Sequence, residues 1–169
     1  YIQKLKDERF VVGLVYIDNY EEALDSTDDV RRSLLAGLID KRVNKYFSPG
    51  SAIVRKLEKD KYIVVFRYNF LEKLMHDRFS LLEEIKSIKI GNEMTLTLSM
   101  GIGTGSAEYS KNYDVAKAAM DLALGRGGDQ AVVKDGEKIL YYGGKSQQME
   151  KNTRVKVRVK AHALRQILD

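Results

Sequence analysis

The sequence lacks cysteine, and it contains one proline and two histidines among its 169 residues. Without cysteine, disulfide bonds, thiolate metal sites and cysteine nucleophiles are excluded. The histidines, His76 and His162, lie far apart in the sequence, so we expect surface residues and no zinc site. No apolar run reaches the roughly 20 residues that cross a bilayer, and the N-terminus shows no signal-peptide pattern.

The composition, with 44% hydrophobic and 31% charged residues, predicts one globular domain with an appendage. Because the chain begins with Tyr1 and not with methionine, we expect a piece of a longer protein. The net charge of +5 is concentrated in residues 151–165, which carry no acidic side chain. This tail is either a phosphate-binding patch or a solvated connector, and we expect no nucleic-acid partner because no aromatic residue interrupts the charges.

Hydrophobic periodicity predicts the first half of the fold. Residues 10–17, FVVGLVYI, are expected to form a central strand that is covered on both faces. Ser26 and Asp29 resemble a capping box for a helix that runs to about Tyr46. The apolar stripe expected on this helix is Val30, Leu34, Leu35, Leu38, Ile39 and Val43.

The second half begins with a predicted β-hairpin, AIVRKL and YIVVFRY, around the charged turn 58–61. Asn69 is expected to cap one helix that extends to Ile88, and residues 95–103 alternate as a half-buried strand does. Asp114 is expected to cap a third helix, which GRGGDQ ends before two short strands, AVVK and KILYY.

This order of elements predicts an α+β, ferredoxin-like fold. It has a β-α-β-β-α-β core and an α-β-β extension, and we expect an antiparallel sheet with its helices on one side. We assign residues 1–9 to an N-terminal linker, 10–145 to the domain and 146–169 to a connector.

Four stretches of residues 10–142 resemble landmarks of the GGDEF (diguanylate cyclase) family, which has a nucleotidyl-cyclase fold. They are YIDNYEE, EKDKY, TLTLSMGIG and AAMDLALGRGGDQAVV. In that family, a D-x-D-x-F pattern and a G-G-[DE]-E-F hairpin surround a nucleoside triphosphate and its magnesium ions. Carboxylate oxygens hold the ions, and glycines let the hairpin backbone lie close to the ligand.

The resemblance also shows departures from the family pattern. Tyr16 stands in place of the first aspartate and Asp18 keeps the second, while Leu24 replaces the asparagine that reads the base and Tyr20 takes the aromatic position. In the hairpin, Glu58 and Lys59 replace the glycine pair, and Asp60 keeps the metal-coordinating third position. Lys61 and Tyr62 replace the glutamate and the phenylalanine. Because one carboxylate does not easily hold two divalent ions, these replacements imply that diguanylate cyclase activity is lost.

The stretches VYIDNYEE and ALGRGGDQAVVK resemble the modified GGDEF domain of GdpP-type cyclic-di-AMP phosphodiesterases. The resemblance implies a parent protein with membrane helices and a PAS sensor upstream, and a Mn²⁺-dependent DHH/DHHA1 phosphodiesterase downstream. The tail NTRVKVRVKAHALRQIL is similar to the stretch that leads into the DHH domain. The chain is then expected at the cytoplasmic face of the cell membrane, as a regulatory domain that binds ATP with at most slow hydrolysis.

Three residues are candidate nucleotide contacts. Asp18 and Asp60 can share one hydrated Mg²⁺ that the phosphates of ATP complete, or they are only capping and turn residues. Arg126 is a candidate phosphate ligand, although the C-terminal end of a helix disfavours anions and its glycines are an ordinary stop. Asp129 stands near the place of a family arginine, so one phosphate contact is missing.

Three functions remain open at this point: an ATP-binding regulatory domain, a residual ATPase, and a ligand-free spacer or dimerisation module that forms a homodimer.

Overall fold

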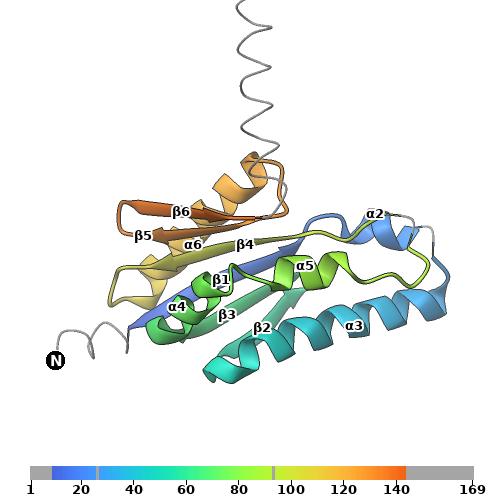
Figure 1. Cartoon of the computed structure of the whole chain (residues 1–169), viewed down its shortest axis with the longest axis horizontal. Coiled ribbons are helices and arrows are strands. Elements are labelled where there is room, and N and C mark those ends of the chain that lie inside the picture. Colours follow the sequence, from blue (N-terminus) through green and yellow to red (C-terminus); the bar gives the residue numbers. More distant parts are fainter. Residues whose placement is uncertain (1–8, 26, 93, 144–169) are drawn as a thin grey trace, which may run out of the picture.

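The computed structural model describes residues 9–25, 27–92 and 94–143, which build one six-stranded sheet with helices on both faces (Figure 1). The strand order is β2-β3-β1-β4-β5-β6. The strands are β1 (Phe10–Ile17), β2 (Ile53–Glu58), β3 (Lys61–Arg67), β4 (Leu98–Thr104), β5 (Ala131–Asp135) and β6 (Lys138–Tyr142).

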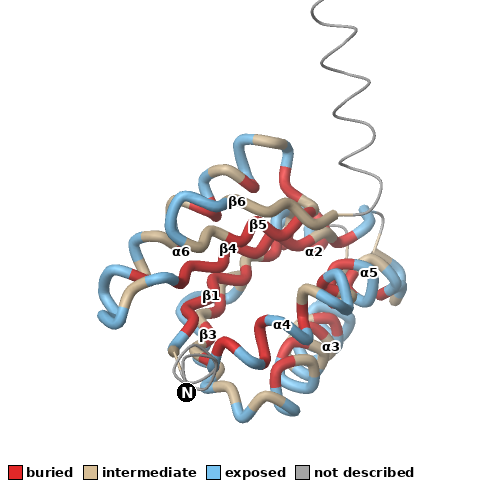
Figure 2. Tube along the Cα trace, turned by 60° about the vertical axis from the view of Figure 1, so that its left-hand side comes forward, coloured by how far each residue is buried: buried red, intermediate tan, exposed pale blue. Residues whose placement is uncertain are grey.

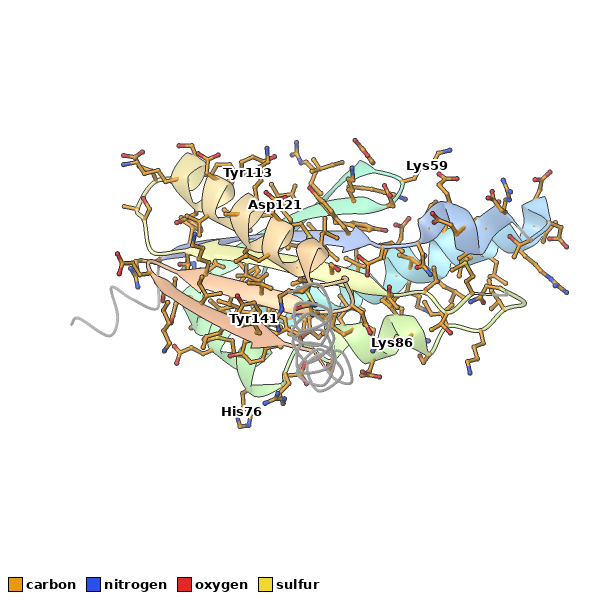
Figure 3. All side chains as sticks on the ribbon, turned by 90° about the horizontal axis from the view of Figure 1, so that it is seen from above. Lys59, His76, Lys86, Tyr113, Asp121 and Tyr141 are labelled. Atoms are coloured by element: carbon orange, nitrogen blue, oxygen red, sulfur yellow. The ribbon has the colours of Figure 1, made fainter. Side chains whose placement is uncertain are left out.

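The helices pack on the two faces of this sheet. They are α2 (Tyr20–Asp25), α3 (Asp29–Phe47), the 3₁₀ turn η1 (Ser48–Gly50), α4 (Tyr68–His76), α5 (Leu81–Lys86) and α6 (Tyr109–Gly125). Helix α6 lies on one face, and α3, α4 and α5 lie on the other (Figures 1 and 3). We expected the helices on one side, and that expectation is wrong.

Strand β1 is central, as its sequence predicted. It pairs with β3 on one side and β4 on the other, and five consecutive residues, from Val11 to Val15, are buried (Figure 2). Val12 and Leu14 face α6, whereas Val11 and Val15 join the larger core under the other helices. A strand buried on both faces reads as a continuous apolar run because it has no solvent side.

The α+β fold class is confirmed, with one departure from an antiparallel sheet. Strands β4 and β5 pair in parallel, with Met100 opposite Ala131, while the other strand pairs are antiparallel. A parallel pair needs a crossover connection, and α6 is that connection. The crossover explains why α6 covers the face that was expected to be free.

Strand β4 is fully buried, and the prediction of a half-buried strand is wrong. Every residue from Leu98 to Thr104 is buried. On the α6 side the strand carries Gly101 and Gly103, and a Cβ atom at Gly103 would lie 2.2 Å from the carbonyl oxygen of Asn112. Helix α6 therefore packs directly against the backbone of β4 at these two glycines, where no side chain separates them.

Helix α3 begins differently from its predicted capping box. Its N-cap is Asp28, whose carboxylate accepts a 2.8 Å hydrogen bond from the backbone N–H of Arg31. Two members of the predicted apolar stripe, Val30 and Leu34, are 79% and 52% exposed. The N-terminal end of α3 extends past the strands (Figure 1).

The single helix predicted between Asn69 and Ile88 is two helices, α4 and α5, and the N-cap of α4 is Arg67. Arg78 and Phe79 interrupt the chain with left-handed φ values of 57° and 52°. Asp77 stabilises this break, because its carboxylate accepts hydrogen bonds from the backbone N–H and the hydroxyl of Ser80, at 3.1 and 2.6 Å. The break turns Phe79 fully into the core.

Helix α6 starts at Tyr109 with Glu108 as its N-cap, so Asp114 lies inside the helix and is not its cap. The predicted stop is confirmed: Gly127 and Gly128 follow the helix with φ values of 100° and 73°. The β-hairpin predicted around the charged turn is also confirmed, since β2 and β3 pair around Lys59 and Asp60.

His76 is exposed at the end of α4, as expected. The basic tail with His162, the connector 146–169 and linker residues 1–8 lie outside the described residues, so the domain limits stay predictions. Among the helices that the structure describes, none combines the length and apolar character of a membrane span.

Candidate functional site

Asp18 lies directly after β1, and three protein groups bind its carboxylate. Its Oδ1 accepts a 2.7 Å hydrogen bond from the hydroxyl of Ser99. Its Oδ2 accepts from the hydroxyl of Thr97 at 2.8 Å and from the backbone N–H of Asp129 at 3.0 Å. Asp18 therefore links the end of β1 to β4 and to the loop that follows α6.

This loop has a backbone that fits against Asp18. Gly128 has a φ of 73°, and a Cβ atom there would lie 2.9 Å from Oδ2 of Asp18. Asp129 is also left-handed, with a φ of 56°, and its Oδ2 lies 2.8 Å from Nζ of Lys86 on α5. Burial raises the pKa of the Asp129 carboxyl, and Lys86 only partly offsets this effect.

Asp60 occupies the β2–β3 turn on the other side of β1. Its backbone carbonyl accepts a 2.8 Å hydrogen bond from the N–H of Ile17. Its charge acts on Tyr20 and Lys61, whereas the carboxylate of Asp18 points to β4. Within the described ranges, no group of three or more histidine, aspartate or glutamate residues could hold a metal ion. A Mg²⁺ shared by Asp18 and Asp60 stays a prediction.

Arg126, at the end of α6, contacts Gln130 in the following loop and Tyr141 on β6. Its Nε donates a 2.9 Å hydrogen bond to Oε1 of Gln130, and its guanidinium carbon lies 4.0 Å from the ring centroid of Tyr141 on β6. The side chain of Gln130 in turn donates to the carbonyl of Gly128 at 2.9 Å. The structure thus brings Arg126 and Asp18 to one loop, and it leaves Asp60 across β1.

Tyr16 and Lys61 stand opposite each other in the pairing of β1 with β3. Nζ of Lys61 lies 5.2 Å from the ring centroid of Tyr16 and 3.2 Å from a carboxylate oxygen of Glu58. Burial raises the pKa of the Tyr16 hydroxyl, and the positive charge of Lys61 partly offsets the rise. A neutral ring and an ammonium group therefore meet where the family resemblance expects two carboxylates.

The opposite face of the hairpin is filled by side chains. Tyr62 is 1% exposed and donates its hydroxyl proton to Asp40 on α3. Lys56 lies 3.1 Å from the same carboxylate. Tyr20 and Leu24 on α2 are each 6% exposed, so the two positions matched to aromatic and base-reading residues are part of the core.

We predict that Tyr62 makes stability fall in alkaline solution. Burial raises the pKa of its hydroxyl, and Asp40 raises it further. Since the unfolded chain releases this proton near pH 10 and the folded chain keeps it, the unfolding free energy should fall above about pH 10. Tyr62→Phe should reduce this slope by up to about 1.4 kcal/mol per pH unit. At neutral pH the variant should be about 1.5 to 3 kcal/mol less stable.

Urea unfolding between roughly pH 8 and 11 measures both effects. Tyr109→Phe is the control, because Tyr109 is 52% exposed on α6, and it should follow the wild-type pH profile. Equal alkaline slopes for Tyr62→Phe and wild type would contradict the prediction.

Sequence reasoning missed the partners of Asp18. Thr97 and Ser99 lie on the polar side of the alternating stretch 95–103, but alternation alone does not specify which side chain they contact. Lys86 and the hydroxyl groups become neighbours of one site only because β4, α5 and the α6–β5 loop converge there. In the pairing of β1 with β4, Ser99 lies opposite Tyr16, two residues before Asp18, so the sequence alone does not identify this contact.

Comparison with known proteins gives a consistent picture. The family description "Cyclic-di-AMP phosphodiesterase GdpP-like, GGDEF domain" matches residues 15–140. The chain is 36% identical over 162 residues to the cyclic-di-AMP phosphodiesterase GdpP of Geobacillus thermodenitrificans, covering 95% of this chain and 25% of that protein. It is 34% identical over 167 residues to the cyclic-di-AMP phosphodiesterase PdeA of Listeria monocytogenes, covering 98% and 25%. The chain spans about a quarter of the length of these relatives.

Solved structures share the fold. The active GGEEF domain of a diguanylate cyclase from Vibrio cholerae superposes with a TM-score of 0.62 at 14% identity, over 76% of this chain and 84% of that one. The GGDEF domain of FimX from Pseudomonas aeruginosa gives a TM-score of 0.60 at 18% identity, over 74% and 80%. At these identities the likeness concerns the fold alone.

Proposed function

Because this chain belongs to the family of GdpP-like GGDEF domains of cyclic-di-AMP phosphodiesterases, we propose that it is a regulatory domain that binds ATP and makes no cyclic di-GMP. Any ATP hydrolysis is slow in this proposal. The fold supports a nucleotide-binding role only in general terms, so the residues at the hairpin end of the sheet must carry it.

The proposed loss of cyclase activity rests on one observation, the pairing of Tyr16 with Lys61. Two-metal transfer between phosphates needs several carboxylate oxygens around both ions. Tyr16 offers a protonated hydroxyl, and Lys61 adds a positive charge at 5.2 Å from its ring. Two metal ions placed here would meet an ammonium group where they need ligands.

ATP binding is proposed at the same end of the sheet. Asp60 is the candidate ligand for one hydrated Mg²⁺, which needs only one or two protein carboxylates when phosphates complete its shell. Asp18 is the second candidate, although three donors already use its oxygens. Arg126 is the candidate phosphate contact, from a guanidinium that now stacks on Tyr141.

We propose that the parent protein carries membrane helices and then a PAS sensor upstream of this domain. In this proposal the domain couples the PAS sensor to a downstream DHH/DHHA1 domain. That domain would hydrolyse cyclic di-AMP with Mn²⁺ at the cytoplasmic face of the membrane. Relatives about four times as long leave room for these domains, and both of these relatives are named cyclic-di-AMP phosphodiesterases.

We predict no cyclic di-GMP from the purified chain with GTP and Mg²⁺, measured by chromatography, and saturable heat on titration with ATP and Mg²⁺. Asp60→Ala should weaken ATP binding by roughly tenfold, because losing one metal ligand costs about 1.4 kcal/mol or more. The control is Glu137→Ala, an exposed carboxylate in the turn of the β5–β6 hairpin, which should bind as wild type does.

Formation of cyclic di-GMP would overturn the first half of this proposal. Absence of ATP heat in all proteins would overturn the second half and favour a spacer or dimerisation module, which sedimentation of the same samples would then test.

A further inference from the structure

The face of the β2–β3 hairpin beside α6 is half open and carries lysine ammonium groups over tyrosine rings. We define the tyrosine–lysine surface as Tyr16, Lys61, Tyr113 and Lys117. Nζ of Lys61 lies 5.2 Å from the ring centroid of Tyr16, and Nζ of Lys117 lies 5.7 Å from that of Tyr113. Both rings are half-buried against one small apolar cluster between β1 and α6, so the two ammonium groups belong to one face.

We infer that the tyrosine–lysine surface binds the triphosphate of the nucleotide, and that Lys61 and Lys117 supply the positive charge that metal ions would otherwise provide. This inference rests on the proposed function, namely that the domain binds ATP. It predicts a phosphate site that works without a divalent ion.

The geometry favours this face over the opposite face of the hairpin. There, Tyr62 is buried and bonded to Asp40, and Tyr20 and Leu24 leave 6% of their surfaces exposed. On the α6 side, Lys117 is exposed and Lys61 is half-buried. Figure 3 shows Tyr113 and Asp121 on α6 and Lys59 at the tip of the hairpin, on the same side of the sheet.

The two lysines are held in place without being neutralised by buried acids. Each ammonium group lies within about 6 Å of a tyrosine ring centroid, and the ring face attracts a cation at this distance. Glu58 pairs with Lys61 at 3.2 Å, but its side chain is 62% exposed, and exposed ion pairs contribute little. A triphosphate carries more charge than one carboxylate and can displace Glu58 from Lys61.

The available carboxylates also favour protein ammonium groups over a metal. Asp18 already accepts three hydrogen bonds. Glu58 and Asp121 both act electrostatically on Tyr16, yet in the part of the chain that the structure describes no three acidic or histidine side chains converge to bind an ion. Glu58 and Asp121 instead oppose a phosphate, so Glu58 limits the affinity of this surface.

Calorimetric titration with ATP, in EDTA and in Mg²⁺, tests the inference. The wild-type chain should still bind ATP in EDTA, and the additional affinity that Mg²⁺ gives should be lost in Asp60→Ala, which removes the candidate metal ligand. Lys61→Gln and Lys117→Gln should each weaken binding by roughly tenfold in EDTA, and Glu58→Gln should tighten it by a few-fold. Inorganic triphosphate should compete with ATP, and adenosine should not.

Lys111→Gln is the control variant and should bind ATP as the wild type does. Lys111 is exposed on α6, and in the described structure it pairs only with Glu108, at 3.6 Å.

The outcomes separate this inference from the proposed function. Binding that requires Mg²⁺, is lost in Asp60→Ala and is unchanged in both lysine variants would overturn the inference and leave the proposed function intact. No binding in either buffer would overturn the proposed function itself. Thermal unfolding of each variant shows whether it is folded, and these exposed or half-exposed lysines are not in the core.

Discussion

Gly103→Ala should be the most damaging single substitution in this domain, with a loss of about 3 kcal/mol or more in unfolding free energy. The added Cβ atom would lie 2.2 Å from the carbonyl oxygen of Asn112 and 2.4 Å from the backbone nitrogen of Ala116. Both atoms belong to the backbone of α6, which cannot move aside as a flexible side chain can. The helix must shift away from β4, and its contacts with β1 and β5 are lost with it.

Urea unfolding followed by circular dichroism measures this loss. Gly37→Ala is the matched control, since Gly37 is an exposed glycine inside α3 with no atom within 4 Å of an added Cβ. That variant should gain about 0.5 to 1 kcal/mol, because alanine is the better helix former. A stability of Gly103→Ala within about 1 kcal/mol of wild type would contradict the close approach of α6 to β4.

Asp18→Ala should destabilise the folded chain by about 3 kcal/mol in the absence of any nucleotide or metal. The change removes one charged acceptor and leaves three donors without it, among them the hydroxyl of Ser99, which is fully buried. It also releases the left-handed turn at Gly128 and Asp129. Asp18→Asn should lose less, because the amide oxygen still accepts one or two of these bonds.

This experiment separates two roles of Asp18. If the carboxylate served only as a metal ligand, its removal would leave stability unchanged or raised, since a negative charge would be lost near Asp129. Asp25→Ala is the control, because that exposed carboxylate pairs with Arg32 at 3.9 Å and should change stability by less than about 0.5 kcal/mol. An unaltered urea midpoint for Asp18→Ala would contradict the structural role.

The elements with the strongest periodicity were predictable. The apolar run of β1, the hairpin around Lys59 and Asp60, and the glycine stop after α6 are local patterns, and the structure has all three. Helix starts were less predictable, because each of the residues 25–29, three aspartates, a serine and a threonine, is of a type that suits an N-cap. Tertiary packing selected Asp28 for α3 and placed Asp114 within α6.

The sequence predicted which residues contribute to the candidate site, but it did not specify how their side chains are arranged. The resemblance identified the replacements at Tyr16 and Lys61, and register then placed these two side chains directly opposite each other. The predicted sharing of a metal by Asp18 and Asp60 depended on where each carboxylate points, which sequence spacing does not specify. The hydroxyl groups of Thr97, just before β4, and Ser99, in β4, hold the Asp18 carboxylate on the side of the α6–β5 loop.

The sequence by itself determined the fold class, the family and the loss of carboxylates at the hairpin, because these depend on residue type and on short-range periodicity. Only the tertiary structure decided that α6 covers β4, that Asp18 holds a loop and that Lys61 and Lys117 reach one face. The physical reason is that these relations join segments far apart in the chain, where crossover direction and strand register set which side chains meet.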